Sequence, residues 1–116
     1  MQQRYRLRAS DDFQRLRREG QAVHHRWMTL SVAHNGFDYN RYGFITGKTL
    51  GKAVIRNRVR RLLREAVRSV HPRIQPGHDI VIIARRPIVG QPFADIQRIV
   101  SEQLRQAGIV VESKAL

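Results

Sequence analysis

The stretch of this sequence best equipped for chemistry runs from residue 53 to 68, AVIRNRVRRLLREAVR. It holds six arginines and a single acid, Glu65. A guanidinium group stays positively charged near neutral pH, so it does not act as an acid or a base there. Its planar fork can instead donate two parallel hydrogen bonds to phosphate oxygens. The chemistry predicted here is therefore the binding of a polyanion, not the breaking of a bond.

On a helical period of 3.6 residues, the apolar side chains of this region share one sector, about 140° wide. They are Ile55, Val59, Leu62, Leu63, Ala66, Val67 and Val70. The remaining arc carries Arg56, Asn57, Arg58, Arg60, Arg61, Arg64 and Arg68. The alternative, a merely solvated helix face, would normally mix charges of both signs. We expect the apolar side to pack on a sheet and the arginines to bind a polyanion.

Two lysines precede this helix, and other reaction chemistries find little support. Lys48 and Lys52 lie in a strand-loop-helix arrangement, where we expect phosphate contacts. Gly47-Lys48-Thr49 is not a P-loop, because Tyr42 stands where that motif needs glycine. The five histidines lack metal-binding spacing, there is no cysteine, and Asp79 has no partner at a catalytic spacing. We expect neither a metal site nor ATP hydrolysis, and nuclease chemistry by the protein itself is disfavoured.

Composition favours nucleic acid as the partner. The chain has 116 residues, a net charge of +13, and 19 arginines among its 22 basic residues. So high a net charge destabilises a small domain through self-repulsion, and it is usually retained because a polyanion neutralises it. The preference for arginine over lysine favours phosphate recognition, and a biased genomic base composition is an equal alternative explanation for that preference. The length predicts one domain over residues 1–116. Arginines interrupt any signal peptide, and the apolar runs are too short to span a membrane, so we expect a cytoplasmic protein.

Six elements must position these residues. Ser10 is an expected N-cap for a helix that passes Phe13 and Leu16 and stops at Gly20. Residues 27–33 alternate, with Trp27, Thr29 and Ser31 on one face, and they are expected to form an antiparallel hairpin with residues 39–46. The arginine-rich helix covers 52–70, a buried central strand covers 78–84, and a last helix covers 92–106. The order α-β-β-α-β-α predicts an α+β sandwich with a loose tail at 110–116.

The arginine-rich stretch resembles the signature helix of the bacterial ribonuclease P protein subunit. The resemblance rests on Lys48, Gly51, Ala53-Val54, Arg56-Asn57-Arg58, Arg60-Arg61, Arg64-Glu65 and Arg68. Tyr5-Arg6-Leu7, Asp12-Phe13 with Leu16 and Gly20, and the segment from Asp79 to Arg85 extend it over nearly the whole chain. Such a spaced set, in the same order of elements, is highly specific.

The resemblance implies a protein subunit of ribonuclease P, the endonuclease that removes the 5′ leader from precursor tRNA. It implies a small mixed sheet packed against helices, with a left-handed crossover between two parallel strands. The implied partners are a catalytic RNA and precursor tRNA, with no obligate protein partner. Catalytic groups and Mg²⁺ are then expected in the RNA, and none in this chain.

Site residues follow from the resemblance in two groups. RNA binding is implied for Lys48, Lys52, Arg56, Asn57, Arg58, Arg60, Arg61, Arg64 and Arg68. A cleft for the single-stranded leader is implied around Phe13, Arg17, Trp27, Thr29 and Ser31. The sequence departs from the family at Arg17, where a second aromatic is common, and at Ser31, where a bulkier side chain often lies. Leader contacts are therefore expected to depend more on charge, and a purely core role for Phe13 stays open.

The main alternative is a structural RNA-binding protein, such as a ribosomal one, without leader recognition. It would share the size, the charge and the lack of cysteine. A DNA-reading helix-turn-helix module is disfavoured, because the segment before the arginine-rich helix reads as a strand rather than as a companion helix. A groove for a single strand separates the two RNA-binding hypotheses.

Overall fold

The computed structural model describes Leu7 and residues 10–111, except for the side chain of Ser10. The expected N-cap contact of Ser10 and residues 112–116 of the expected tail therefore lie outside the described residues. The expectation of a loose tail from residue 110 is wrong at its start, because Val110 bridges to Ile74 and the backbone NH of Val111 donates to the carbonyl of Arg73 at 2.6 Å. The elements are α1 (Ser10–Glu19), β1 (Gln21–His24), β2 (Met28–His34), β3 (Arg41–Ile45), η2 (Lys48–Leu50), α2 (Ala53–Val70), η3 (His71–Arg73), β4 (His78–Ala84), η4 (Arg86–Ile88) and α3 (Phe93–Gln106). The three helices and the central strand confirm the predicted segments closely.

The sheet has the strand order β1-β2-β4-β3. β4 pairs antiparallel with β2 and parallel with β3, so the sheet is mixed, as expected. β4 is central because its β-branched side chains, including Ile80, Val81 and Ile82, are buried on both of its faces. α2 joins the parallel strands β3 and β4, and the left-handed sense of this crossover stays a prediction.

The expected hairpin between residues 27–33 and 39–46 is wrong, because β4 lies between β2 and β3. The loop of residues 35–40 is long enough to pass the end of one intervening strand, since neighbouring strands lie only about 4.8 Å apart. β2 instead forms its hairpin with β1, where the backbone NH of His25 donates to the carbonyl of Met28 at 3.0 Å. β1 was not predicted, because it is a short, largely exposed edge strand.

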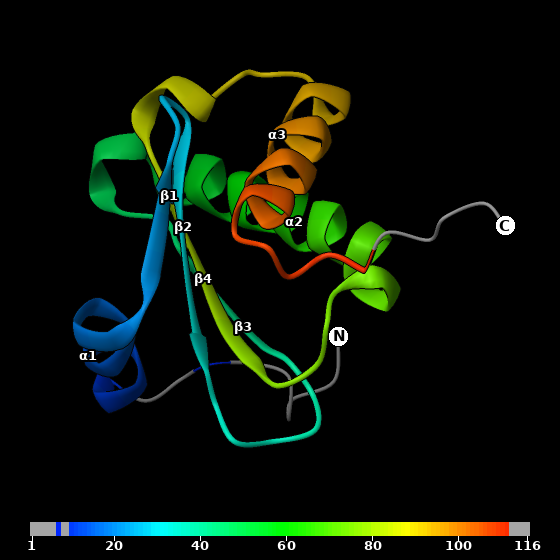
Figure 1. Ribbon diagram of the computed structural model, residues 1–116. Helices are drawn as coiled ribbons and strands as arrows, with labels where there is room; N and C mark the ends of the chain where they lie inside the picture. The colour runs from blue at the N-terminus through cyan, green and yellow to red at the C-terminus, as the bar shows by residue number, and fades with distance from the viewer. Residues whose placement is uncertain (1–6, 8–9, 112–116) are drawn as a thin grey trace, which may run out of the picture.

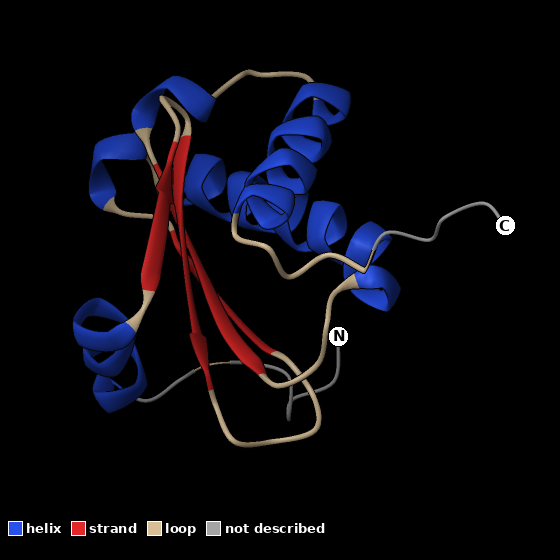
Figure 2. Cartoon of the chain, viewed as in Figure 1, coloured by secondary structure: helices blue, strands red, loops and turns tan. Residues whose placement is uncertain are grey.

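The two faces of the sheet are covered unequally (Figures 1 and 2). α2 and α3 cover one face and enclose the main core, in which Leu30, Leu63, Ile82 and Leu104 are fully buried. α1 lies against part of the other face, over a small cluster of Leu7, Leu16, Ala33 and Val81. None of the described helices covers the rest of that second face.

Gly43 allows α1 to approach the sheet closely. A Cβ atom at this position would lie 3.0 Å from the ring of Phe13 and 3.3 Å from the Cβ of Leu7. These distances are tighter than ordinary van der Waals contact. The glycine thus makes room for Phe13 to rest on β3 beneath α1.

Candidate nucleic-acid interface

The apolar side of α2 attaches the helix to the sheet. Its buried side chains are Val59, Leu63, Ala66, Val67 and Val70. Ile55 and Leu62, at the margin of the predicted sector, are half-buried. The amphipathic helix predicted from the sequence is therefore confirmed, and its orientation is fixed by apolar contacts.

The opposite side of α2 presents cationic groups to solvent. Asn57, Arg58, Arg61 and Arg68 are exposed, and Arg56, Arg60 and Arg64 are partly exposed. Neither Arg58 nor Arg61 forms an ion pair with any residue that the structure describes. Arg68 lies 3.5 Å from Glu65, but both side chains are well exposed, and such a pair contributes little to stability. The charges of Arg58 and Arg61 are thus not neutralised by any side chain in the described part of the chain.

Arg56 and Arg60 lie on the flank of α2 that faces the end of β3. The guanidinium of Arg60 donates to the Oδ1 of Asn57 at 2.8 Å and to the Oγ1 of Thr46, which directly follows β3. The Nε of Arg56 is buried and finds no acceptor among the described residues. These contacts orient Arg60 toward the end of β3, at the edge of the sheet.

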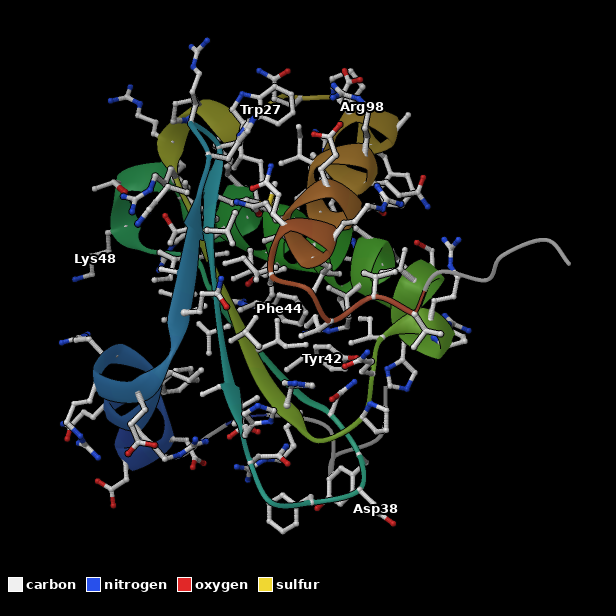
Figure 3. The ribbon with its side chains drawn as sticks, in the orientation of Figure 1. Trp27, Asp38, Tyr42, Phe44, Lys48 and Arg98 are labelled. Atoms are coloured by element: carbon white, nitrogen blue, oxygen red, sulfur yellow. The ribbon has the colours of Figure 1, made fainter. Side chains whose placement is uncertain are left out.

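Lys48 and Lys52 lie where the chain enters α2. Lys48 begins η2 and projects away from the sheet (Figure 3). Lys52 is the N-cap residue of α2, whose first turn carries no acid. Their charges add to the positive end of the helix dipole, an arrangement that favours anions.

The second candidate site is a cleft of about 90 Å³ on the sheet face opposite α2. α1 contributes Phe13, Leu16 and Arg17, and the sheet contributes Ser31, Ile45, Val81 and Ile83. The structure therefore brings together three predicted cleft residues, Phe13, Arg17 and Ser31. Phe13 is half-buried, so its ring is shared between the small core cluster and the cleft.

Thr29 lies on the same sheet face as Ser31, beyond the end of α1. Its hydroxyl accepts hydrogen bonds from the Nη2 of Arg85 at 2.8 Å and from the Nε of Arg85 at 3.1 Å. The Nδ1 of His24 lies 3.3 Å from the same hydroxyl. Thr29 is buried and thus serves to hold the exposed Arg85 over the open end of the face.

The expectation that Trp27 shares a face with Thr29 and Ser31 is wrong. Trp27 precedes β2, in the turn after β1, so the strand alternation does not extend to it. Its ring packs against the main core and meets the ring of His25 edge to face at 5.2 Å (Figure 3). The structure therefore removes Trp27 from the cleft.

Sequence reasoning missed four side chains at this face: Ile45, Val81, Ile83 and Arg85. Alternation in the strand 78–84 places Val81 and Ile83 opposite Ile80 and Ile82, so the signal for their shared face was present. That alternation did not show which face of the sheet α1 covers only in part. Ile45 is the last residue of β3, directly before Thr46, so the cleft and the Arg60 flank of α2 are contiguous.

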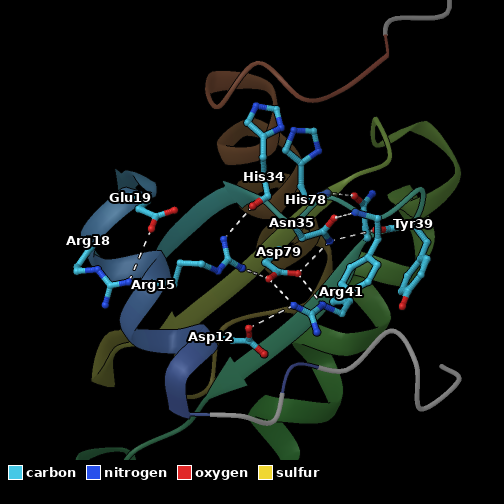
Figure 4. Close-up of polar contacts among 12 residues, drawn as sticks. Asp12, Arg15, Arg18, Glu19, His34, Asn35, Tyr39, Arg41, His78 and Asp79 are labelled. Atoms are coloured by element: carbon cyan, nitrogen blue, oxygen red, sulfur yellow. Dashed lines mark hydrogen bonds and ion pairs between the residues drawn. The ribbon is translucent and has the colours of Figure 1, made fainter.

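Asp79 is fully buried beside the far end of α1 and is surrounded by cations (Figure 4). Arg41 donates to both carboxylate oxygens at 2.8 Å, and Arg15 pairs with Oδ2. The amide of Asn35 donates to Oδ1 at 3.0 Å. The hydrogen bond to Asp79 is the main cause that raises the pKa of Arg41 above its ordinary value, against the opposing effect of burial. Asp79 is therefore a structural anchor, and its carboxylate is fully engaged.

Comparison with known proteins identifies the family of this chain. A family model described as Ribonuclease P matches residues 1–108. The chain belongs to the ribonuclease P protein family. Its members are protein components of ribonuclease P, the ribonucleoprotein endonuclease of tRNA processing.

Relatives and solved structures of the ribonuclease P family agree with this match. The ribonuclease P protein component of Roseiflexus sp. is 44% identical over 97% of this chain and 93% of its own length. The RNase P protein of Staphylococcus aureus has a TM-score of 0.84 at 32% identity and covers 91% of this chain and 97% of its own. That of Thermotoga maritima has a TM-score of 0.78 at 30% identity and covers 86% and 96%. No described helix has the length and apolar character needed to cross a membrane.

Proposed function

We propose that this ribonuclease P protein binds the RNA subunit of the enzyme through the cationic side of α2 and the 5′ leader of precursor tRNA through the cleft beneath α1. The observation that carries the proposal is that α2 is held by buried apolar side chains while Arg58 and Arg61 have no counter-ion among the residues that the structure describes. The phosphates of an RNA would supply the negative charges that these two arginines lack.

Binding of the RNA subunit by α2 is an electrostatic event. The proposed contacts are Lys48, Lys52, Arg56, Asn57, Arg58, Arg60, Arg61, Arg64 and Arg68. Each arginine that neutralises a phosphate releases condensed counterions, so affinity falls steeply as salt rises. Because buried apolar side chains anchor α2, its backbone does not have to be ordered upon binding, and the entropic cost is limited to the arginine side chains themselves.

Leader binding in the cleft combines one ring with several cations. Phe13 can stack on an unpaired base without reading its identity, and Arg17, Arg60 and Arg85 are placed to follow the backbone. Ser31 contributes a polar group on the sheet face, and the buried Thr29 acts through Arg85, which its hydroxyl holds. A single aromatic ring and a small volume favour a leader that is held loosely and with little sequence preference.

The chain's own part in the reaction is to bind and position the two RNAs. Mg²⁺ held by the RNA subunit would supply the activated water that cleaves the leader. The protein would raise substrate affinity and lower the Mg²⁺ concentration that the RNA requires, by reducing repulsion between the two polyanions.

Cleavage of precursor tRNA by the cognate RNA at low Mg²⁺ tests this proposal. Adding the protein should stimulate cleavage, and the protein should bind precursor tRNA better than mature tRNA. Crosslinking to the leader should map to Phe13 and its neighbours. Equal binding of precursor and mature tRNA would favour a structural RNA-binding protein instead, and cleavage by the protein alone would contradict the assignment of catalysis to RNA.

A further inference from the structure

A second groove lies on the other flank of α2, away from the leader cleft. It has a volume of about 230 Å³ and is lined by Ile55, Arg58, Val59 and Leu62 of α2 and by residues 88–91, at the end of η4 and beyond. Because α2 covers the opposite sheet face from α1, this groove and the cleft beneath α1 lie on opposite sides of the sheet (Figure 1).

The groove is apolar inside and cationic at its rim. Ile55, Leu62, Ile88 and Val89 form most of its walls, and the exposed Arg58 stands at its edge without an ion-pair partner among the described residues. Val89 itself is 36% exposed. Apolar side chains gathered on a soluble protein in this way mark an interaction site more often than isolated ones do.

The charge around the groove selects a polyanion as the occupant. Residues 39–64 and 80–94, which contain every groove residue, include neither Asp nor Glu. The nearest acids along the chain, Glu65 and Asp95, pair with Arg68 and Arg98 at 3.5 and 3.6 Å. The volume lies below the range of about 300–1,000 Å³ typical of sites for drug-sized ligands, so it suits a single ring rather than a helix of another protein.

We infer that this groove receives one unpaired nucleobase of the ribonuclease P RNA, while Arg58 binds the adjoining phosphate. The inference rests on the proposed function, because it requires that the RNA backbone follow α2. The apolar walls of Ile55, Leu62 and Val89 cover the faces of the base, and the arginines outside hold its backbone. Such apolar contacts are non-directional and involve the ring faces rather than the hydrogen-bonding edges, so they tolerate any base.

Photo-crosslinking of the complete protein, assembled with its cognate RNA, tests the location. A benzophenone amino acid in place of Val89, which is 36% exposed, should crosslink to one unpaired nucleotide or a short unpaired segment of that RNA. The same crosslinks should form without precursor tRNA. A benzophenone at Phe37, an exposed position in the loop after β2, serves as the matched control and should give no such crosslink. A crosslink from Val89 to a second copy of the protein would overturn the inference.

Salt titrations of RNA binding separate the base from the phosphate. Val89→Asn should weaken binding about fivefold, the effect of losing about 1 kcal/mol of apolar burial, with an unchanged slope of log affinity against log salt, and Val89→Leu should retain wild-type affinity. Arg58→Ala should reduce that slope by about 1. Val111→Asn, at an exposed site outside the groove, should change neither quantity.

The two proposals fail in different ways. If Val89→Asn binds RNA normally while the salt slope stays steep and cleavage is stimulated, the groove inference is wrong and the proposed function stands. If binding does not respond to salt and the wild-type protein does not stimulate cleavage, the proposed function itself is wrong.

Discussion

Arginines serve opposite purposes in two regions of this molecule. Around Asp79, Arg15 and Arg41 are partly buried and paired with a carboxylate that has no exposure to solvent. On α2, Arg58 and Arg61 are exposed and unpaired among the described residues. The first group uses charge to hold α1, β3 and β4 together, and the second keeps its charge available for a ligand.

The comparison shows that the placement of acids decides what an arginine does. Asp12 and Asp79 lie beside Arg41, so this end of the molecule neutralises its own charge. Between Asp38 and Glu65 the sequence has no acid at all, and α2 begins within that interval. Residue type alone predicts cationic charge, but whether that charge is available depends on where the few carboxylates fold.

Removing the unpaired arginines should give the largest effect, and it should affect RNA binding only. Replacing Arg56, Arg58 and Arg61 with alanine should weaken binding to the cognate RNA on the order of 1,000-fold near 0.1 M salt, because each phosphate contact contributes about tenfold there. The free energy of unfolding, measured in urea, should change by less than about 1 kcal/mol. The triple alanine variant at Arg73, Arg98 and Arg105 removes equal charge elsewhere and should bind nearly normally. Unfolding of the first variant would mean that those arginines are structural.

Removing the buried carboxylate should have the reverse effect. Asp79→Asn should lower the free energy of unfolding by about 3 kcal/mol, the lower end of the range for breaking a buried ion pair, because both arginines keep some contact with water. The exposed Asp38→Asn is the control and should stay within about 0.5 kcal/mol of the wild type. A stable Asp79→Asn variant with weakened RNA binding would erase the distinction between the two regions.

The sequence predicts the arrangement of side chains on α2 better than the cluster of side chains around Asp79. Periodicity over residues 53–70 is a local signal, and it places the apolar sector and the arginines correctly. The partners of Asp79 come from α1, the loop after β2, and β3, as distant in sequence as 64 residues for Arg15. No local pattern brings them together.

The same limit explains the errors in the sheet and the cleft. Alternation in β2 shows that Thr29 and Ser31 share a face, but it does not show which strand lies beside β2 or which face α1 covers. Trp27 was misplaced because the strand alternation starts only at Met28, whereas Trp27 still belongs to the turn that follows β1. Ile45 and Arg85 join the site only through the strand order β1-β2-β4-β3.

Phe13 offers a smaller effect that tests whether the cleft acts separately from α2. Phe13→Leu keeps an apolar side chain over Gly43 but removes the stacking surface, so the affinity ratio of precursor to mature tRNA should fall about fivefold. Affinity for the RNA subunit should be unchanged. Phe93→Leu, an exposed position on α3, is the matched control for loss of a ring. A lower unfolding free energy with an unchanged ratio would assign Phe13 to the core alone.

The smallest expected effect concerns Glu65, the one acid of α2. Its pair with Arg68 joins side chains that are 52% and 72% exposed, so Glu65→Gln should change the free energy of unfolding by less than about 0.5 kcal/mol. The substitution also removes a negative charge beside the proposed RNA surface and releases Arg68. Affinity for the RNA should therefore rise about two- to threefold at low salt. At high salt the affinities of variant and wild type should converge, because salt screens the difference in charge. Binding isotherms at several salt concentrations measure this directly. If Glu65→Gln instead weakens RNA binding, the pair with Glu65 positions Arg68 for its phosphate. Glu65 would then orient an arginine, as Asp79 does at the other region.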